Sequence, residues 1–282
     1  MDDDVLPPHP PATVGTVVHD PHVLPTPALS NLRDIGGRAT ADGARVRRGV
    51  AFRSAELRSP AVADDPTVAS LGLRTVVDLR TFAEHAVAPD VLPPGAQGVH
   101  LDVLALDPHA PAADLTQVLA DPRLAEQVLA DLDPAGQMVR TYVDLVAGAP
   151  ARRGYATLLR RLLDPADRPL LYHCTAGKDR TGWATTVLLV VAGVDEDGVH
   201  EEYLAVNPTV RAMYAPLLDG FAAVGGDPEL LVPLLEVREE YLEAALDATE
   251  EHYGGFDGYL RRGLGLHDAE LAEIRAVLRD EG

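Results

Sequence analysis

Residues 170–182, LLYHCTAGKDRTG, decide the fold and the chemistry of this chain. The apolar run at 170–173 predicts a buried strand, and an apolar helical pattern begins at Thr181. A short loop that enters a helix N-terminus directs several backbone N–H groups into one concavity, which suits a phosphate dianion. The predicted phosphate-binding loop consists of Thr175, Ala176, Gly177, Lys178, Asp179 and Arg180.

The loop also combines a nucleophile with a cation. Cys174 opens it, and Arg180 follows after five intervening residues. The positive field of the helix N-terminus and of Arg180 favours the thiolate, which is the form of cysteine that attacks a phosphate ester. The planar guanidinium of Arg180 can hold two oxygens of the transferred group. Gly177 would let the backbone approach the phosphate without an intervening Cβ.

Two flanking residues are expected to support this chemistry. The Thr181 hydroxyl could hydrogen-bond the thiolate and help it leave in the second step, and the His173 ring could brace the loop from beneath. The alternative is a buried structural cysteine at an ordinary strand–helix turn. That interpretation needs a separate reason for each of the other residues of the stretch, so the catalytic interpretation is favoured.

Strand and helix patterns alternate ahead of the loop, which predicts an α/β fold with a mostly parallel central sheet flanked by helices. The predicted strands are Val46–Arg53, Thr75–Leu79, Val99–Val103 and Leu170–His173. The predicted helices are Asp64–Leu71, Ala135–Ala147, Arg152–Leu163, Thr181–Ala192, Asp195–Ala205, Leu234–Ala248 and Asp268–Arg279, with a stop at Asn207-Pro208.

The domain organisation follows from length and composition. The 282 residues show no break in composition, so we expect an extended tail at 1–28 and a single domain at 29–282. Residues 104–134, rich in Ala, Asp and Pro, resemble an insertion with the character of a mobile flap. A solvated tail explains His9, His19 and His22 better than a metal cluster does, and no metal or cofactor is expected.

Charge and apolar runs limit the partners and the location. Lys and Arg number 24 against 44 Asp and Glu, which gives a formal net charge of −20. Such a chain repels nucleic-acid backbones and anionic lipid surfaces, so we expect no nucleic-acid partner and no general adhesion to membranes, while a local basic pocket stays open. The N-terminus does not have the pattern of a secretory signal, and the apolar runs are too short for a membrane span. We therefore expect no stable membrane insertion and a cytoplasmic location, with secretion by another route left open. The single cysteine excludes an internal disulfide and a Cys-rich metal site.

Several stretches resemble bacterial protein tyrosine phosphatases. HCTAGKDRTG at 173–182 is similar to the Cys-x5-Arg loop of that family. Further similar blocks are NLRDIGG at 31–37, FRSAEL at 52–57, VVDLRTFAE at 76–84 and YLEAALDATEEHYGGFDGYLRRGLG at 241–265. The chain resembles in particular the group that includes a secreted mycobacterial enzyme, over nearly everything after the tail. The resemblance implies a tyrosine-phosphatase-like fold with a helical lid and a helical C-terminal part.

The resemblance also implies the source of the catalytic proton. The best-known tyrosine phosphatases carry this acid on a separate loop after a Trp-Pro pair, but the one tryptophan here, Trp183, lies in the helix after the loop. The implied acid is Asp179, inside the loop itself, whose alternative role is to tie the loop down by hydrogen bonds. Asp102 and Asp107 are rivals, in and just after the third predicted strand, where dual-specificity enzymes keep their acid.

Other polar residues have two open interpretations each. Lys178 beside Asp179 resembles loops of phosphoinositide phosphatases, and the alternative is a solvated surface lysine. Asp78 and Arg80 end the second predicted strand, at the sheet edge where such folds bind ligands. Asp78 could hold Arg180 or Lys178 by a charge pair, or it could be an ordinary polar strand end. The residues expected to brace the site or the fold are Asn31, Arg33, Asp34, Arg53 and Glu56.

The predicted function is a cysteine-dependent phosphatase that hydrolyses phosphotyrosine through a phosphocysteine intermediate. Phosphoserine, phosphothreonine and phosphoinositides are further candidate substrates, and inorganic phosphate would be the product bound in the loop. The alternatives are a phosphate-binding module without turnover, a phosphoinositide-specific phosphatase, and sulfur transfer or arsenate reduction. The presence of both Cys174 and Asp179 argues against the first of these. Arg180 and the absence of a second cysteine argue against the last.

Overall fold

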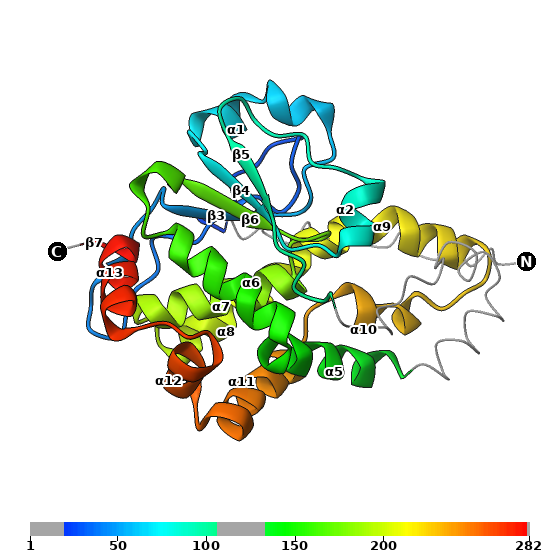
Figure 1. Ribbon diagram of the computed structural model, residues 1–282. Helices are drawn as coiled ribbons and strands as arrows, with labels where there is room; N and C mark the ends of the chain where they lie inside the picture. The colour runs from blue at the N-terminus through cyan, green and yellow to red at the C-terminus, as the bar shows by residue number, and fades with distance from the viewer. Residues whose placement is uncertain (1–19, 106–132, 281–282) are drawn as a thin grey trace, which may run out of the picture.

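The sheet that carries the loop has five strands in the order β1-β3-β6-β4-β5. In the computed structural model, which describes residues 20–105 and 133–280, helices flank this sheet (Figure 1). The strands are β1 (Arg33–Asp34), β3 (Ala51–Ser54), β4 (Thr75–Asp78), β5 (Gln97–His100) and β6 (Leu170–His173). β3, β4, β5 and β6 run parallel, whereas β1 pairs antiparallel with β3 at one edge. The predicted mostly parallel sheet is therefore confirmed.

Helices make up most of the rest of the described chain. The α-helices are α1 (Pro66–Ser70), α2 (Phe82–Val87), α5 (Pro134–Ala147), α6 (Ala149–Arg161), α7 (Asp179–Ala192), α8 (Glu196–Leu204), α9 (Asn207–Ala223), α10 (Val232–Leu235), α11 (Glu239–Tyr253), α12 (Phe256–Gly258) and α13 (Asp268–Leu278). Short 3-10 turns are η1 (Pro60–Ala63), η2 (Pro165–Asp167) and η3 (Pro228–Leu230), and η4 (Tyr259–Gly263) is a π turn. Figure 1 shows α6 and α7 on one side of the sheet and α1 on the other.

The two faces of the sheet bury separate cores, because successive side chains of a strand point to opposite sides. Val77 and Tyr172 face the larger core, which α5, α6, α7, α11 and α13 complete. Val76 and Leu171 face a smaller core under the N-terminal segments. The rings of Phe256 and Tyr259 pack against Trp183 of α7, at 5.7 and 5.6 Å between ring centroids. The C-terminal helices thus belong to the same body as the sheet.

The strand register brings polar side chains together at the carboxyl edge of the sheet. Ser54, His173, Asp78 and His100 are register partners on β3, β6, β4 and β5. Cys174 follows β6 directly, so the loop begins at the middle of this edge. Parallel α/β sheets bind their ligands at such an edge.

Both ends of the described chain are tied to other parts of the molecule. Leu24 N–H donates to Leu32 O at 2.9 Å, and Val23 forms a bridge with Arg33. Residues 20–28, the described part of the predicted tail, are thereby held along β1. At the other end, β7 (Arg279–Asp280) pairs antiparallel with β2 (Arg45–Val46). None of the described helices has the length and apolar character needed to cross a membrane.

Two of the predicted strands have different bounds in the structure. The predicted strand Val46–Arg53 is divided between β2 and β3 by a turn in which Gly49 has a φ of +73°. This left-handed conformation, favoured by glycine, ends the strand. The third strand starts at Gln97 and ends at His100, because Asp102 accepts hydrogen bonds from backbone N–H groups and turns the chain.

The helical segments differ at the proline positions. Asn207-Pro208 starts α9 instead of stopping a segment, since proline is tolerated in the first turn of a helix. The predicted helix Leu234–Ala248 is shifted, because α10 ends at Leu235 and α11 starts at Glu239. Most of the predicted insertion at 104–134 lies outside the described residues.

Candidate active site

The scaffold holds the carbonyl groups of the loop on its outer side. The Asn31 side-chain amide donates to Ala176 O and to Gly177 O, each at 3.1 Å. Arg53 adds a hydrogen bond from Nη2 to Gly177 O at 2.6 Å. Asn31 and Arg53 are both buried, at 3 % and 0 % exposed, so these contacts anchor the loop to the first strands of the sheet.

The outward carbonyls determine the direction of the N–H groups. Thr175 O is held in the same way, by Glu56 N–H at 3.1 Å. In a trans peptide the N–H points opposite to the C=O of the same unit, so the N–H groups of residues 176–178 point to the inner side of the loop. These N–H groups have no hydrogen-bond acceptor in the part of the chain that the structure describes. They can therefore converge on the oxygens of a bound phosphate.

Gly177 is required by the packing of the loop against the sheet. Its φ is +68°, in the left-handed region that favours glycine. A Cβ at this position would lie 2.2 Å from Ser54 O, at the end of β3. The backbone of β3 thus takes the space that the missing Cβ leaves, whereas we expected the phosphate to take it.

Cys174 lies at the base of the loop and is 2 % exposed. His173 Nδ1 lies 3.1 Å from Cys174 O, and His173 Nε2 lies 3.0 Å from Asp90 Oδ2. Both partners are acceptors, so the ring donates from both nitrogens when it is protonated. The structure thus places His173 beneath the loop, where it holds the carbonyl next to the thiol.

Thr181, in the first turn of α7, is fully buried. Its Oγ1 has no hydrogen-bond partner among the described residues, Cys174 included. A buried hydroxyl without a partner is unfavourable by about 1–3 kcal/mol. A thiolate that accepted this hydrogen bond would therefore be stabilised by it.

Arg180 is paired with Glu84, a residue outside the loop. Arg180 Nη1 and Nη2 donate to the two carboxylate oxygens of Glu84, at 2.6 and 2.9 Å. Thr175 Oγ1 donates to Glu84 Oε1 at 2.6 Å and accepts from Arg180 Nη2 at 3.3 Å. Burial by itself would raise the pKa of Glu84 and lower that of Arg180. The pairing outweighs burial, so the pKa of Glu84 lies well below its usual range and that of Arg180 well above.

Glu84 had a recognisable signal in the sequence. Thr81 N–H donates to Glu84 Oε2 at 2.8 Å, and Glu84 N–H donates to Thr81 Oγ1 at 3.2 Å. This reciprocal pair is a capping box, whose signature is Ser or Thr followed three residues later by Glu or Gln. The signature predicts the start of α2, which the apolar pattern alone does not reveal, but it says nothing of Arg180.

Asp179 opens α7 with its carboxylate between two donors. Tyr142 OH donates to Asp179 Oδ1 at 3.1 Å, and Lys178 Nζ lies 3.5 Å from Asp179 Oδ2. Tyr203 OH donates in turn to Tyr142 OH at 2.8 Å. The Asp179 side chain is 18 % exposed, so it remains accessible beside the thiol loop. Neither tyrosine belongs to a local motif, so no pattern in the sequence marks them as part of the site.

Lys178 is buried, and its ammonium donates to Leu234 O in α10. The alternative of a solvated surface lysine is therefore wrong. The contact joins the loop to α10. Together with the ion pair to Asp179, it restrains the Lys178 side chain from two sides.

Asp78 and Arg80 form a pair of their own. Arg80 Nε and Nη2 donate to Asp78 Oδ1 and Oδ2, at 2.9 and 2.8 Å. Arg80 also donates to Glu56 and Asp90, at 2.9 and 2.7 Å. The expectation that Asp78 holds Arg180, or the lysine of the loop, is therefore wrong. Burial would raise the pKa of Asp78, but the hydrogen bonds from Arg80 outweigh it and lower the pKa to about 2.

A buried ion cluster supports the loop from behind. Glu202 of α8, 1 % exposed, accepts from Arg53 Nη1 at 3.2 Å and from Arg33 Nη2 at 3.4 Å. Arg38 Nη2 donates to the same carboxylate. Because Arg53 also binds Gly177 O, the position of α8 is coupled to the loop. The sequence does not indicate that Glu202 is the buried member of the pair Glu201-Glu202.

Of the rival acids, Asp102 lies in the turn after β5. Asp102 Oδ2 accepts from Phe82 N–H at 2.8 Å, and Asp102 Oδ1 accepts from Leu104 N–H at 3.0 Å. Both oxygens are thus engaged in the turn after β5, as in a structural cap. Asp107 lies outside the described residues.

Two groups of described side chains place metal-ligand atoms near one another: Asp78 with His85 and His100, and Asp78 with Asp90 and His173. The His85 and His100 rings stack, at 4.4 Å and 16°. One ion could not lie in both ring planes, where the nitrogen lone pairs point. Asp78 also binds Arg80 through both of its oxygens, so the geometry fits hydrogen bonding better than metal coordination.

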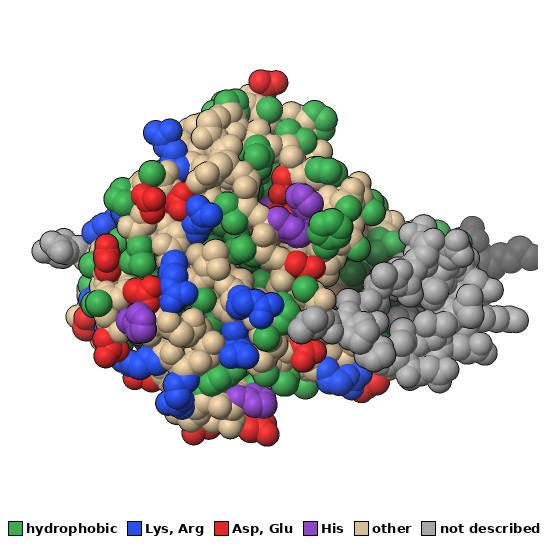
Figure 2. Space-filling view, viewed as in Figure 1, with side chains coloured by type: hydrophobic (Ala, Val, Ile, Leu, Met, Phe, Trp, Pro, Cys, Tyr) green, Lys and Arg blue, Asp and Glu red, His purple; other side chains and the backbone are tan. Residues whose placement is uncertain are grey.

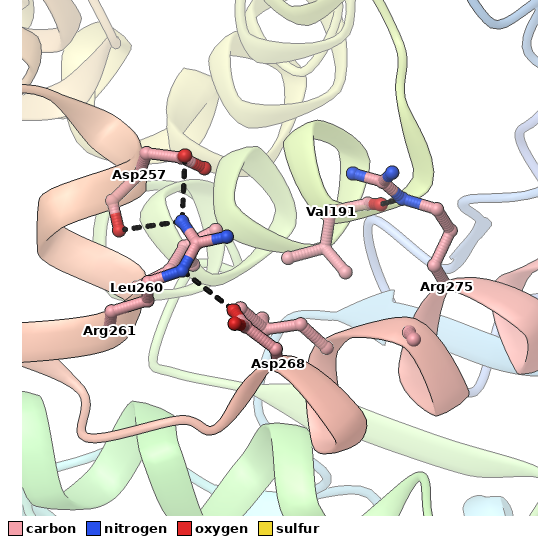
Figure 3. Close-up of a pocket in the computed structure, with 8 residues that line it drawn as sticks. Val191, Asp257, Leu260, Arg261, Asp268 and Arg275 are labelled. Atoms are coloured by element: carbon pink, nitrogen blue, oxygen red, sulfur yellow. Dashed lines mark hydrogen bonds and ion pairs between the residues drawn. The ribbon is translucent and has the colours of Figure 1, made fainter.

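Away from the loop, surface charges of opposite sign are mixed. A pocket with a volume of about 210 Å³ is lined by parts of α7, α12, η4 and α13. Figure 3 shows the side chains that line it. Arg261 lies there between Asp257 and Asp268, and Arg275 donates to Val191 O at 2.8 Å. Figure 2 shows a similar mixture of basic and acidic side chains over this face of the molecule. The paired charges of this pocket make it a poor anion site compared with the loop.

A parallel sheet that delivers a buried cysteine into a loop of inward N–H groups, closed by an arginine, defines a cysteine-dependent phosphatase. The chain belongs to the tyrosine phosphatase family, whose model matches residues 24–280. The resemblance seen in the sequence is thereby confirmed.

Individual relatives agree with this family. The chain is 34 % identical over 262 residues to a candidate tyrosine-protein phosphatase of Cupriavidus necator, which covers 93 % of this chain and 91 % of that protein. It is 33 % identical over 277 residues to the triple specificity protein phosphatase PtpB of Mycobacterium tuberculosis, covering 89 % and 97 %. A solved structure, the core catalytic domain of the PP-IP phosphatase SIW14 from S. cerevisiae in complex with citrate, aligns with 75 % of this chain and 90 % of that chain. At 13 % identity and a TM-score of 0.29, this last likeness carries no argument.

Proposed function

We propose that this chain hydrolyses phosphotyrosine through a phosphocysteine intermediate on Cys174. The observation that carries the proposal is the loop between β6 and α7, in which inward N–H groups lie between Cys174 and Arg180. Membership of the tyrosine phosphatase family supports the same reaction.

In the first step, the Cys174 thiolate attacks phosphorus, a sulfur–phosphorus bond forms, and the bond from phosphorus to the leaving oxygen breaks. The N–H groups of residues 176–178 and the Arg180 guanidinium would hold the non-bridging oxygens during this transfer. Protonated Asp179 would give its proton to the leaving oxygen, which departs as an alcohol or a phenol. The alcohol or phenol can then leave the site while the phosphoryl group stays on sulfur.

In the second step, a water molecule attacks the phosphocysteine and the sulfur–phosphorus bond breaks. The Asp179 carboxylate would accept a proton from this water, which restores the acid for the next cycle. The products are inorganic phosphate and the Cys174 thiolate. The buried Thr181 hydroxyl, which lacks another partner among the described residues, would stabilise that thiolate.

Arg180 keeps donors available for phosphate even while it is paired. A guanidinium carries five N–H donors. Glu84 uses one on each terminal nitrogen, and Thr175 uses the second on Nη2. The Nε–H and one Nη1–H have no acceptor within the described ranges. Glu84 would therefore orient Arg180 without preventing it from binding the transferred group.

We propose a substrate range wider than phosphotyrosine, including phosphoserine, phosphothreonine and phosphoinositides. The Mycobacterium tuberculosis relative is named a triple specificity phosphatase, which supports a broad range. Phosphorylated proteins or phosphoinositides would then be the partners and inorganic phosphate the product ligand. A cytoplasmic location and a single catalytic domain at 29–282, with residues 20–28 along its edge, complete the proposal.

The first experiment compares wild type and Cys174→Ser in p-nitrophenyl phosphate hydrolysis. We expect the variant to be inactive, and equal rates would overturn the proposal. A panel of phosphotyrosine peptides, phosphoserine and phosphothreonine peptides and phosphoinositides then defines the range. Tight binding of phosphopeptides without release of phosphate by wild type would instead indicate a binding module.

A further inference from the structure

We propose that Tyr142, oriented by Tyr203, is a positioning residue that directs the catalytic proton of Asp179 to Oδ2. The inference rests on the proposed role of Asp179 as the general acid. It concerns which carboxylate oxygen carries the proton and which residues decide this. Three elements take part, because α5 supplies Tyr142, α8 supplies Tyr203 and α7 begins with Asp179.

The chain of hydrogen bonds is buried and continuous. Tyr203 OH donates to Tyr142 OH at 2.8 Å, and Tyr142 OH donates to Asp179 Oδ1 at 3.1 Å. Tyr142 and Tyr203 are 0 % and 2 % exposed. Their rings meet edge to face, with centroids 6.1 Å apart at 87°. This packing restricts both rings, so the hydroxyl groups are held in line with the carboxylate.

The two hydroxyl protons have one favourable arrangement. In the observed direction, each hydroxyl donates to the next oxygen, and the chain ends on a carboxylate. If Oδ1 carried a proton and donated it to Tyr142, one of the two hydroxyl protons would lose its acceptor. Either Tyr142 would accept from both neighbours and its own proton would have no acceptor, or both hydroxyl groups would reverse and Tyr203 OH would have none among the described residues. A buried donor without an acceptor is costly, so a proton on Oδ1 is disfavoured.

It follows that a proton on Asp179 resides on Oδ2. Lys178 Nζ lies 3.5 Å from that oxygen, where it forms an ion pair but no hydrogen bond. Oδ2 is therefore free to carry the proton that would go to the leaving oxygen. The tyrosines themselves stay protonated donors, since burial raises the pKa of both well above 10.

Other titratable groups also face Asp179. Arg180 follows it on α7, and Lys178 precedes it in the loop. The remaining titratable groups that interact with it are Tyr155 of α6, Tyr214 of α9 and Tyr241 of α11. None of these three has a hydrogen bond to the Asp179 carboxylate within the described ranges, so Tyr142 alone among the tyrosines fixes the oxygen that stays unprotonated.

The test is Tyr142→Phe, assayed with a poor and a good leaving group. We expect kcat for phenyl phosphate to fall about ten-fold, the value of one hydrogen bond to a charged group, while kcat for p-nitrophenyl phosphate changes less than about two-fold. KM should be unchanged for both. The limb of the pH–rate profile that reports Asp179 should move to higher pH by about one unit, because the ionised carboxylate loses a donor.

Two further variants separate this role from a structural one. Tyr241→Phe removes a buried hydroxyl that donates to Pro233 O from a ring 5.8 Å from Tyr142, and it should behave as wild type. Tyr203→Phe should move the pH–rate limb in the same direction as Tyr142→Phe but less. Equal losses on both leaving groups in Tyr142→Phe, or no loss on either, would overturn the inference.

Asp179→Asn distinguishes the two proposals. If Asp179→Asn slows phenyl phosphate turnover and Tyr142→Phe adds less than about two-fold in that background, Tyr142 acts through Asp179, as proposed. If Asp179→Asn is slow but Tyr142→Phe lowers phenyl phosphate turnover by a further factor of about ten in that background, only this inference fails. If Asp179→Asn turns over phenyl phosphate as fast as wild type, the assignment of the acid fails, and this inference fails with it.

Discussion

Glu84 binds both terminal nitrogens of Arg180, at 2.6 and 2.9 Å, and so connects the first turn of α2 to the end of the catalytic loop. A two-pronged pair of this kind fixes the plane of the guanidinium as well as its position. The capping box with Thr81 holds Glu84 in turn. The orientation of Arg180 therefore depends on a residue 96 positions earlier in the chain.

The first prediction concerns this pair. Glu84→Gln keeps the shape of the side chain but removes its charge, so the Arg180 plane is held more weakly. We expect kcat/KM for p-nitrophenyl phosphate to fall about ten-fold, since a bidentate charged pair contributes on the order of 1.5–3 kcal/mol. Steady-state kinetics measures kcat/KM, and inhibition by inorganic phosphate is a second readout.

The matched control is Glu270→Gln. Glu270 also pairs with an arginine, Arg160, at 2.7 Å, but on the surface and far from the loop in sequence. The kcat/KM of the Glu270→Gln variant should stay within about two-fold of wild type, because exposed ion pairs contribute little to stability or activity. The role of Glu84 is contradicted if both variants retain full activity.

The second prediction uses glycines with similar backbone angles. Gly177 has a φ of +68° and faces Ser54 O, which a Cβ would approach to 2.2 Å. Gly43 has a φ of +88° and open space around it. Gly177→Ala should abolish phosphatase activity and lower stability by more than about 3 kcal/mol, whereas Gly43→Ala should cost about 1 kcal/mol, the backbone term alone.

Urea unfolding and p-nitrophenyl phosphate hydrolysis measure the two effects. If Gly177→Ala cost no more than Gly43→Ala, the close packing of the loop on β3 would be refuted. Loss of activity without loss of stability would show that the end of β3 moves to make room for the new Cβ and that only the loop is displaced.

The loop could be recognised from sequence because its chemistry is local. Cys174 and Arg180 stand in one stretch of residues, on a strand and helix whose apolar patterns are clear. The parallel sheet follows from the same patterns. The apolar patterns were wrong about the start of α9, where a proline begins a helix, and about the divided strand, where Gly49 has a positive φ. They also misplaced the bounds of β5 and the break between α10 and α11.

Of the supports of the loop, Asn31 is among the residues expected from the sequence to brace the site, and it does contact the loop at Ala176 O and Gly177 O. Glu84 and Tyr142 were not assigned to the site from the sequence. They lie 96 and 37 positions from their partners in the loop, and periodicity marks only which face of a segment is apolar.

For Asp78 the sequence left two interpretations open, a charge pair with Arg180 or Lys178 and an ordinary polar strand end, because a strand end indicates proximity but does not rank competing cations. In the structure, tertiary packing places Arg80 against Asp78.

The third prediction tests the outer side of the loop. Asn31 donates to Ala176 O and Gly177 O, and its own φ is +53°. Asn31→Ala removes both hydrogen bonds and leaves a less suitable residue in a left-handed conformation. We expect a loss of about 2–3 kcal/mol in stability and at least a ten-fold fall in kcat/KM, because the peptide units that aim the N–H groups are released.

Asn31→Asp serves as the comparison for shape. It keeps the conformation but places a carboxylate against two carbonyl oxygens, so it should be as damaging to activity as the alanine variant. An active Asn31→Asp protein would mean that the outward carbonyls do not need this amide.

The fourth prediction is the dependence of stability on acid. The pKa of Asp78 is lowered from its ordinary 3.8 to about 2, since the pairing with Arg80 outweighs burial. A group whose pKa is lower in the folded state than in the unfolded state stabilises the folded state at pH values above the unfolded pKa. The stabilisation is lost as pH falls through the folded value, here between about pH 4 and pH 2. The contribution at neutral pH is on the order of 2 kcal/mol.

Asp78→Asn should therefore lower the free energy of unfolding at pH 7 by about 2 kcal/mol and flatten its dependence on pH between about 4 and 2. Urea unfolding at a series of pH values measures both. Asp280→Asn, at an exposed pair with Arg47, should keep the wild-type curve. If Asp78→Asn lost as much stability at pH 2 as at pH 7, the loss would come from packing around Arg80 and not from the charge of Asp78.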